Sequence, residues 1–219
     1  MTSFEIELKY FLTLDRAKAV LAQNNHITKN LEQSFFKKSE LVQIYEQCFT
    51  VNERSLLIDQ CTAGRVRKEI FNQRVSYCVT FKGPKDKDLN RIELEKSISE
   101  ELYQQLLKHE LRGTIAKDRH VVAGSLELDS GEVIDLKAEI DLVTSLKLPF
   151  ATVDVELPDT QYIYPFREKK HSFDFLKEDA LELSIQDKKL RSFLNMKHLA
   201  RYGYDQDAQN AAAYFLARL

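Results

Sequence analysis

Charged side chains recur at every second position along a series of predicted strands, and this period constrains the fold more than any other feature. The first segment, FEIELKYF at residues 4–11, places Glu5, Glu7 and Lys9 on one face and apolar residues on the other, because side chains alternate along a strand. One such segment alone indicates a half-buried strand with a solvated face. Its repetition on later strands indicates that the charged faces do not simply face solvent.

The later segments repeat this spacing with both signs of charge. The seven acids are Glu5, Glu7, Glu93, Glu95, Asp141, Asp154 and Glu156, and the seven bases are Lys9, Arg65, Arg67, Lys82, Arg91, Lys117 and Arg119. The opposite faces carry residues suited to a core, such as Leu8, Val66 and Phe81. A sheet that curls its charged faces inward encloses a polar cavity, and unpaired buried charge is costly. Carboxylates suit Mg²⁺ or Mn²⁺ and clustered bases suit phosphate, so the pattern predicts a metal-bound oligophosphate as the guest.

The order of elements favours an antiparallel sheet or barrel, because parallel pairing would need a crossover between each pair of strands. Helices are predicted at 14–23, after a cap at Ser99, from about 173 onward, and after a cap at Asp205. Residues 26–40 are predicted to be a polar connection. Strands are predicted near 41–51, 55–59, 63–71, 75–83, 89–98, 115–122, 124–129, 132–143 and 150–157.

Composition narrows the classes of partner and compartment. The 219 residues carry a formal net charge of −2, so the composition does not indicate the basic surface typical of proteins that bind nucleic acid. Cys48, Cys61 and Cys78 are odd in number and lack C-x-x-C spacing, which favours buried thiols in a reducing cytoplasm. No apolar run approaches the roughly 20 residues of a membrane span, and the first residues do not resemble a secretory signal. We therefore expect a cytoplasmic protein without a membrane or nucleic-acid partner.

The ordered motifs resemble those of the CYTH family, also called triphosphate tunnel metalloenzymes. EIELK matches the family's E-x-E-x-K signature, and it is followed by R-x-R at 65–67, T-x-K at 80–82, R-x-E-x-E at 91–95 and K-x-R at 117–119. An acidic strand position at Asp141 and a terminal acidic pair at Asp154 and Glu156 complete the series. The resemblance covers about residues 4–157.

This resemblance implies an α+β protein with an eight-stranded antiparallel β-barrel tunnel, surrounding helices and a helical C-terminal extension. We expect a tunnel domain at 1–172 and an extension at 173–219 that packs on the barrel's outer apolar face, the alternative being a helix that closes one tunnel mouth or docks a second subunit. Two positions depart from the family: Asp154 replaces the more frequent Glu, and Phe49 stands for a Tyr in a predicted strand. The first shortens the reach to a metal and the second removes a hydroxyl.

The resemblance also implies roles for the charged residues. A catalytic group is expected at Glu5, Glu7, Lys9, Arg65 and Arg67. Substrate binding is expected from Lys9, Arg65, Arg67, Lys82, Arg91, Lys117 and Arg119, and Mg²⁺ or Mn²⁺ binding from Glu5, Glu7, Glu93, Glu95, Asp141, Asp154 and Glu156.

The leading interpretation is a metal-dependent triphosphatase that hydrolyses the terminal phosphoanhydride of tripolyphosphate or an organic triphosphate. The alternatives are a class IV-type adenylyl cyclase that makes cyclic AMP from ATP, and a non-catalytic module that binds triphosphate or polyphosphate. A cyclase needs a pocket for the base, and no segment clearly supplies one. The sequence does not choose the substrate, and it leaves a homodimer open.

Overall fold

The structure is a computed structural model of the chain, and it describes residues 2–50, 61–85, 90–168, 170–183 and 188–219. The strands are β1 (Thr2–Thr13), β2 (His26–Phe36), β3 (Ala63–Phe71), β4 (Arg74–Lys85), β5 (Asn90–Ile98), β6 (Leu111–Glu127), β7 (Val133–Val143), β8 (Phe150–Leu157) and β9 (Leu181–Glu182). The α-helices are α1 (Leu14–Gln23), α2 (Leu41–Cys48), α4 (Glu100–Leu106), α5 (Ile163–Arg167), α6 (Asp174–Glu178), α7 (Lys188–Phe193), α8 (Met196–Tyr202) and α9 (Gln206–Leu216). Short 3-10 turns precede α2 (Lys38–Glu40) and α5 (Thr160–Tyr162).

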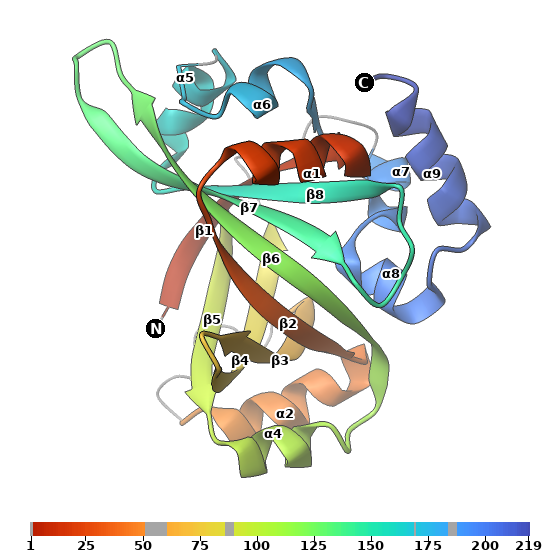
Figure 1. The fold of residues 1–219 in the computed structure, drawn as a ribbon. Helices are drawn as coiled ribbons and strands as arrows, with labels where there is room; N and C mark the ends of the chain where they lie inside the picture. The colour runs from red at the N-terminus through yellow and green to blue at the C-terminus, as the bar shows by residue number, and fades with distance from the viewer. Residues whose placement is uncertain (1, 51–60, 86–89, 169, 184–187) are drawn as a thin grey trace.

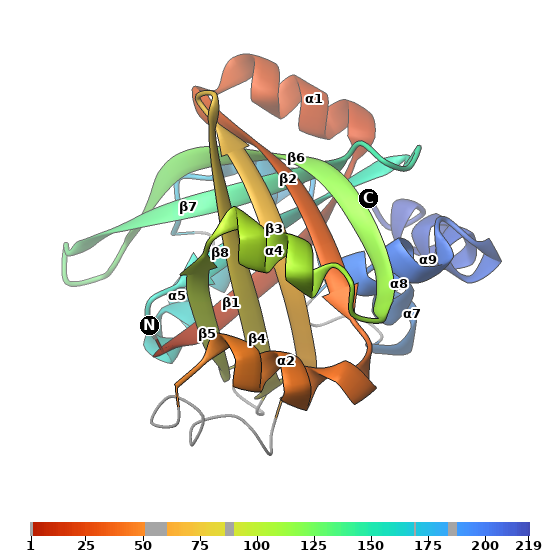
Figure 2. The same ribbon diagram turned by 90° about the horizontal axis from the view of Figure 1, so that it is seen from below.

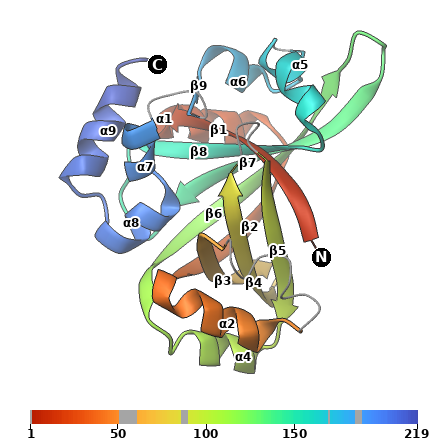
Figure 3. The same ribbon diagram turned by 180° about the vertical axis from the view of Figure 1, so that it is seen from behind.

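All nine strands join one antiparallel sheet in the order β5-β4-β3-β2-β6-β7-β8-β1-β9 (Figure 1). Strand β1 has two long neighbours: residues 6–13 pair with β8, and residues 2–6 pair with β5 from the other end of the order. Figure 3 shows β1 running from the side of β5 to the side of β8. Strand β1 therefore pairs with β5, the first strand of this order, as well as with β8 near its end.

Alternation along the strands separates an apolar outer face from a charged inner face. In β1 the side chains of Ile6, Leu8 and Tyr10 belong to an apolar cluster, whereas Glu7 and Lys9 point the other way. Helix α1 lies over β8 and closes this cluster, with Ala17 and Val20 buried (Figure 1). Residues of α5 and α6, such as Phe166 and Phe175, extend the same cluster.

A second apolar cluster lies under α2 and α4, which sit next to each other against β3, β4 and β5 (Figure 2). Leu41, Ile44, Tyr45 and Cys48 of α2 are buried, at the i, i+3, i+4, i+7 spacing of a helix. Burial of this stripe fixes the outer face of the strands that carry Arg65, Arg67 and Lys82.

The C-terminal segment packs on two faces: α6 lies on the outer apolar face that we predicted, whereas α7, α8 and α9 lie on a different one. The apolar residues of these last three helices form a third cluster with Phe11, Phe35, Ile115 and Phe150. In β1, Phe11 follows Glu7 and Lys9 at the same period, so this cluster covers one end of the inner face rather than the outer face. Helix α8 approaches β6 so closely that a Cβ at Gly113 would lie 1.9 Å from the carbonyl oxygen of Ala200. The helices therefore cap one end of the charged interior.

Most predicted elements are confirmed, and two are wrong. Ser99 accepts a hydrogen bond from Leu102 N at the start of α4, and Asp205 accepts one from Ala208 N at the start of α9, as predicted. The predicted strand at 41–51 is instead helix α2, and the predicted connection at 26–40 contains strand β2. The two strands predicted at 115–122 and 124–129 are one long strand, β6. The strand predicted at 55–59 lies outside the described residues.

Phe49 needs a further correction, because it does not lie in a strand. It follows the last residue of α2 and stacks on Tyr45 with ring centroids 4.8 Å apart. The absence of a tyrosine hydroxyl there therefore affects an apolar cluster and not the charged interior. The three cysteines are free thiols; Cys48 is buried, as predicted, whereas Cys61 and Cys78 are only partly buried. Among the described helices, none is long and apolar enough to cross a membrane.

Candidate active site

The inner face of the sheet encloses a cavity of about 1420 Å³. Strands β1 to β8 all contribute lining residues, Thr62 and Pro158 lie next to strand ends, and Leu183 together with six residues between Lys188 and Lys197 completes the lining. Most of the charged residues predicted for the site line this cavity. They are Glu7, Lys9, Arg65, Arg67, Lys82, Glu93, Glu95, Lys117, Arg119, Asp154 and Glu156.

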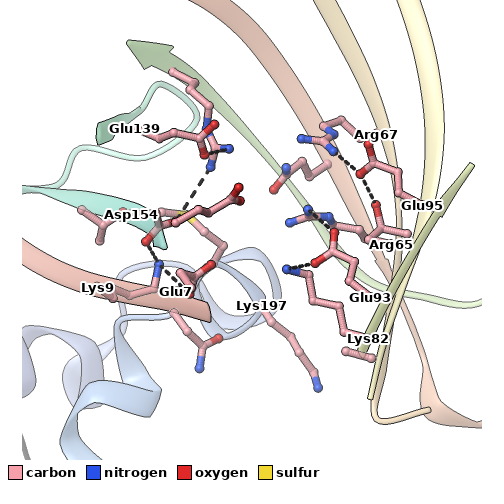
Figure 4. Close-up of a pocket in the computed structure, with 18 of the residues that line it drawn as sticks. Glu7, Lys9, Arg65, Arg67, Lys82, Glu93, Glu95, Glu139, Asp154 and Lys197 are labelled. Carbon is pink, nitrogen blue, oxygen red and sulfur yellow. Dashed lines mark hydrogen bonds and ion pairs between the residues drawn. The ribbon is translucent and has the colours of Figure 1, made fainter. Parts of the chain in front are cut away.

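One wall of the cavity carries Glu7 of β1 and the acidic pair Asp154 and Glu156 of β8. Lys9 lies opposite Asp154 in the β1–β8 ladder and forms an ion pair with it, and Lys9 Nζ lies 3.8 Å from Glu7 (Figure 4). Burial acts to lower the pKa of Lys9, but Asp154 and Glu7 outweigh it and raise that pKa above its ordinary value. Lys9 therefore stays protonated and suits an anion contact better than proton abstraction.

The facing wall carries bases from β3 and β4 and acids from β5 (Figure 4). Arg67 binds Glu95 at 2.5 Å, and Lys82 binds Glu93 at 2.5 Å. Arg65 lies 4.0 Å from Glu93, and burial together with the positive charge of Arg67 lowers its pKa. The cross-strand register that places Lys82 opposite Glu93 keeps these side chains on the same face.

A buried ion cluster joins β6 to β7 and β8. Lys117 and Arg119 both bind Asp141, and Arg119 also binds Glu139 and lies 3.8 Å from Asp154. Asp141 is only 1% exposed, and the two bases hold its pKa below the ordinary range. Burial lowers the pKa of Lys117 to about 8, with Arg119 adding to this shift and Asp141 opposing it.

These contacts leave each predicted base whose side chain is described beside a carboxylate that a phosphate group can replace. Phosphate oxygens accept charge-assisted hydrogen bonds from Arg and Lys in the same way as carboxylate oxygens do. The two walls converge on a single space, so a linear anion can contact Lys9 at one side and Arg67 and Lys82 at the other (Figure 4). Arg119, near Asp154, belongs to the side of Lys9.

The donor set for a divalent cation is best tested at Glu156. It lies directly opposite Glu7 across the β1–β8 ladder, and like charges in such pairs repel each other. Burial first, and then the negative charges of Glu139, Glu7 and Glu93, raise the pKa of Glu156. A cation bound there would relieve this repulsion, and hard carboxylate oxygens are the ligands that Mg²⁺ and Mn²⁺ prefer. The residues present therefore fit such an ion in chemistry.

The acids suit a divalent cation by their chemistry, but their described side chains are not arranged around a single ion. Within the part of the chain that the structure describes, no three His, Cys, Asp or Glu side chains converge closely enough to hold a metal. Several of the acids are instead directed toward bases, as in the pairs of Asp154 with Lys9 and of Glu95 with Arg67. Metal binding would thus accompany an exchange of these ion pairs.

Three predicted site residues are placed differently from the rest. Asp141 is not among the lining residues and its carboxylate is held by Lys117 and Arg119, an arrangement that orients these two bases. Glu5 and Arg91 lie opposite each other in the β1–β5 ladder, but their side chains are outside the described part of the structure. The roles assigned to these three residues stay predictions.

Sequence reasoning missed several groups that line the cavity. Lys29 and Gln33 lie on β2, which was predicted to be a connection. Glu139 and Thr152 stand two residues before the predicted Asp141 and Asp154, so one more step of the same period would have found them. Lys188 and Lys197 come from the helical segment, where no strand period marks them.

Comparison with solved structures finds similar folds at low sequence identity. The PH1819 protein of Pyrococcus horikoshii matches with a TM-score of 0.51 and 20% identity, over 81% of this chain and 93% of that one. A candidate adenylate cyclase from Bacillus halodurans matches with a TM-score of 0.50 and 12% identity, over 89% and 99%. The inorganic triphosphatase NE1496 matches with a TM-score of 0.43 and 17% identity, over 90% and 94%, a superposition too loose to carry an argument.

The matched structures are CYTH-fold proteins, so the predicted resemblance is confirmed at the level of the fold. Identities of this size show the fold alone. No protein-family model matches the chain, and no curated protein matches it in sequence. The activity must therefore be argued from the cavity itself.

Proposed function

We propose that this protein is a divalent-metal-dependent triphosphatase that cleaves the terminal phosphoanhydride of tripolyphosphate or an organic triphosphate. The observation that carries the proposal is the convergence of two charged walls on one cavity of about 1420 Å³. One wall presents Glu7, and the other presents Arg65, Arg67 and Lys82 (Figure 4). Glu156 lines the same cavity and lies opposite Glu7 in the β1–β8 ladder. A metal-bound oligophosphate complements both walls at once.

The chain's own residues would divide the work by wall. Arg65, Arg67 and Lys82 would bind the oxygens of the terminal phosphate and neutralise the charge that grows as the bond to it breaks. Lys117 and Arg119, held in place by Asp141, would bind the remaining phosphate groups of the substrate. Carboxylates such as Glu7 and Glu156 would hold Mg²⁺ or Mn²⁺, which would supply charge neutralisation as the phosphoanhydride breaks.

The tunnel itself is part of this proposal. Pairing of β1 with β5 at residues 2–6 and with β8 at residues 6–13 supports an eight-stranded barrel around the cavity. We assign residues 1–172 to this tunnel domain and 173–219 to the helical extension. We place the protein in the cytoplasm, in keeping with its three free thiols.

A substrate panel tests the proposal. Tripolyphosphate, thiamine triphosphate and ATP would be assayed for released phosphate and for cyclic AMP, with Mg²⁺ and with Mn²⁺. We expect phosphate release that requires the metal, and Glu7→Gln should lower it roughly 10- to 100-fold at limiting metal because a ligand charge is lost. Glu132→Gln, at an exposed turn position, is the matched control and should keep wild-type activity.

Each contrary result has its own meaning. Cyclic AMP without phosphate release would replace the hydrolase by the cyclase alternative. Tripolyphosphate binding without turnover of any substrate would indicate the non-catalytic module. Full activity of Glu7→Gln at limiting metal would show that the metal site is placed wrongly.

A further inference from the structure

Gln33 is a buried polar residue that no part of the proposed mechanism uses. It lies in β2, lines the charged cavity and is 0% exposed. Neither its amide nitrogen nor its amide oxygen has a hydrogen-bond partner among the described residues, and neither atom is accessible to water. Buried amides are almost always hydrogen-bonded, because an unpaired one loses its contacts with water without replacement.

The neighbours of Gln33 along β2 and on β6 give no reason for an amide at this position. The neighbours of Gln33 along the same face of β2 are Leu31 and Phe35, and its partner on β6 is Ile115, all of them apolar. An apolar side chain of the same length would suit these neighbours and would leave no polar atom unpaired. A buried polar group that stabilises no part of the fold is typical of a functional site.

The strand register places Gln33 among three of the predicted phosphate-binding bases. Arg67 lies directly opposite it on β3, in the β2–β3 ladder. Arg65 lies opposite Phe35, and Lys117 lies opposite Leu31, so both are diagonal neighbours of Gln33. Diagonal neighbours on one face of a sheet are about 7–8 Å apart, within reach of long side chains. A phosphate group held by these bases would therefore lie close to the amide.

We propose that Gln33 is a substrate-contacting residue of the triphosphate site, its amide N–H donating to a phosphate oxygen held by Arg67 and Lys117. The inference rests on the proposed function. Its amide oxygen would then accept from Arg67, whose guanidinium carries five N–H donors and here binds Cys78 and Glu95. Because both amide atoms are covered without ligand, the anion reaches them as the surrounding bases leave their carboxylates.

Gln33→Met tests this contact, because methionine keeps the length of the side chain and removes only its hydrogen bonds. Binding of tripolyphosphate with Mg²⁺ would be measured by calorimetry, and unfolding without ligand by urea. We expect the dissociation constant to rise roughly tenfold or more, since a hydrogen bond to a charged group is lost. The urea midpoint without ligand should stay the same or rise, because an unpaired amide is removed.

A second variant and a control sharpen the result. Gln33→Glu places a carboxylate beside Arg67 that competes with phosphate, so it should weaken binding more than Gln33→Met does. Gln104→Leu, at an exposed position of α4, should change neither measurement.

The two proposals fail in different ways. Wild-type affinity in both Gln33 variants, with the wild-type protein binding tripolyphosphate, would overturn the role of Gln33 alone. A lower urea midpoint in Gln33→Met with unchanged affinity would make the amide structural and would also overturn it. No binding of tripolyphosphate by the wild-type protein would overturn the triphosphatase proposal and this inference with it.

Discussion

At the scale of single residues, the cavity holds one base whose charge depends on pH near neutrality. Burial lowers the pKa of Lys117 to about 8, whereas the carboxylates beside Lys9 raise the pKa of that residue. Arg119, bonded to the same Asp141, has a pKa raised further above its already high value. Between about pH 7 and pH 10, Lys117 is thus the member of these three that loses its charge.

This difference predicts a pH dependence for anion binding. Below pH 8 the Lys117 ammonium is charged and attracts phosphate. Above pH 8 the amine is mostly neutral, so it must be protonated before it can attract the anion. The affinity for tripolyphosphate in EDTA should therefore fall by up to about tenfold per pH unit above pH 8. Calorimetry between pH 7 and 10 measures it.

Lys117→Arg is the matched control, because its guanidinium stays charged over this range. In this variant the affinity for tripolyphosphate should fall much less above pH 8. Any fall that remains would come from titration of the ligand and not of the Lys117 amine. An equally steep decline in Lys117→Arg would contradict the assignment.

At the scale of elements, the start of α9 rests on one side chain. Asp205 accepts from Ala208 N and also contacts His198 at 3.2 Å. The Ala208 amide is the first of the contacts that lower the pKa of Asp205. Its stabilising effect is therefore complete above the ordinary pKa of 3.8 and is lost as the pH falls through the lower, folded-state pKa.

Asp205→Ala should lower the free energy of unfolding by about 1 kcal/mol at pH 7, because a helix N-cap is removed. Asp205→Asn keeps an acceptor oxygen and should retain most of the stability. The loss caused by alanine should shrink below pH 3.8. Urea unfolding at pH 7 and pH 3 measures these differences, and wild-type stability of Asp205→Ala at pH 7 would show that the cap does not stabilise α9.

The two mistaken elements show which signals the sequence carried and how they were misread. In α2, Leu41, Ile44, Tyr45 and Cys48 follow helical spacing, but Val42, Ile44 and Tyr45 are β-branched or aromatic residues that also suit a strand. Strand β2 has the opposite difficulty, since its outer positions are polar and its first half is exposed. A polar strand of this kind has the composition of a connection, and only its neighbours in the sheet reveal it.

At the scale of the whole molecule, most of the candidate site was predictable because it follows one simple rule. The motifs with charges at period two delivered most of their described side chains to the same cavity, including pairs such as Glu7 and Glu156 that are 149 positions apart in the chain. What the rule could not supply was tertiary: the ion pairs between walls, the cover over Gln33, and the packing of the C-terminal helices against Phe11 and Phe150.

The charge balance of the whole cavity predicts the response of the fold to ligand. The acids and bases now neutralise each other in pairs that include the buried cluster at Asp141. Such pairs recover only part of the cost of removing charge from water. A ligand that binds only the folded protein stabilises it by about 2.7 kcal/mol at 100 times its dissociation constant.

For a chain of this size that corresponds to a rise in melting temperature of roughly 5–10 °C. Tripolyphosphate with Mg²⁺ should produce it, Mg²⁺ alone should produce less, and orthophosphate should have little effect because it reaches only one part of the two walls. Double-stranded DNA should have no effect, since it cannot enter the cavity. Thermal unfolding followed by circular dichroism measures each shift. A melting temperature that is unchanged by every oligophosphate in the presence of metal would contradict a tunnel built for such anions.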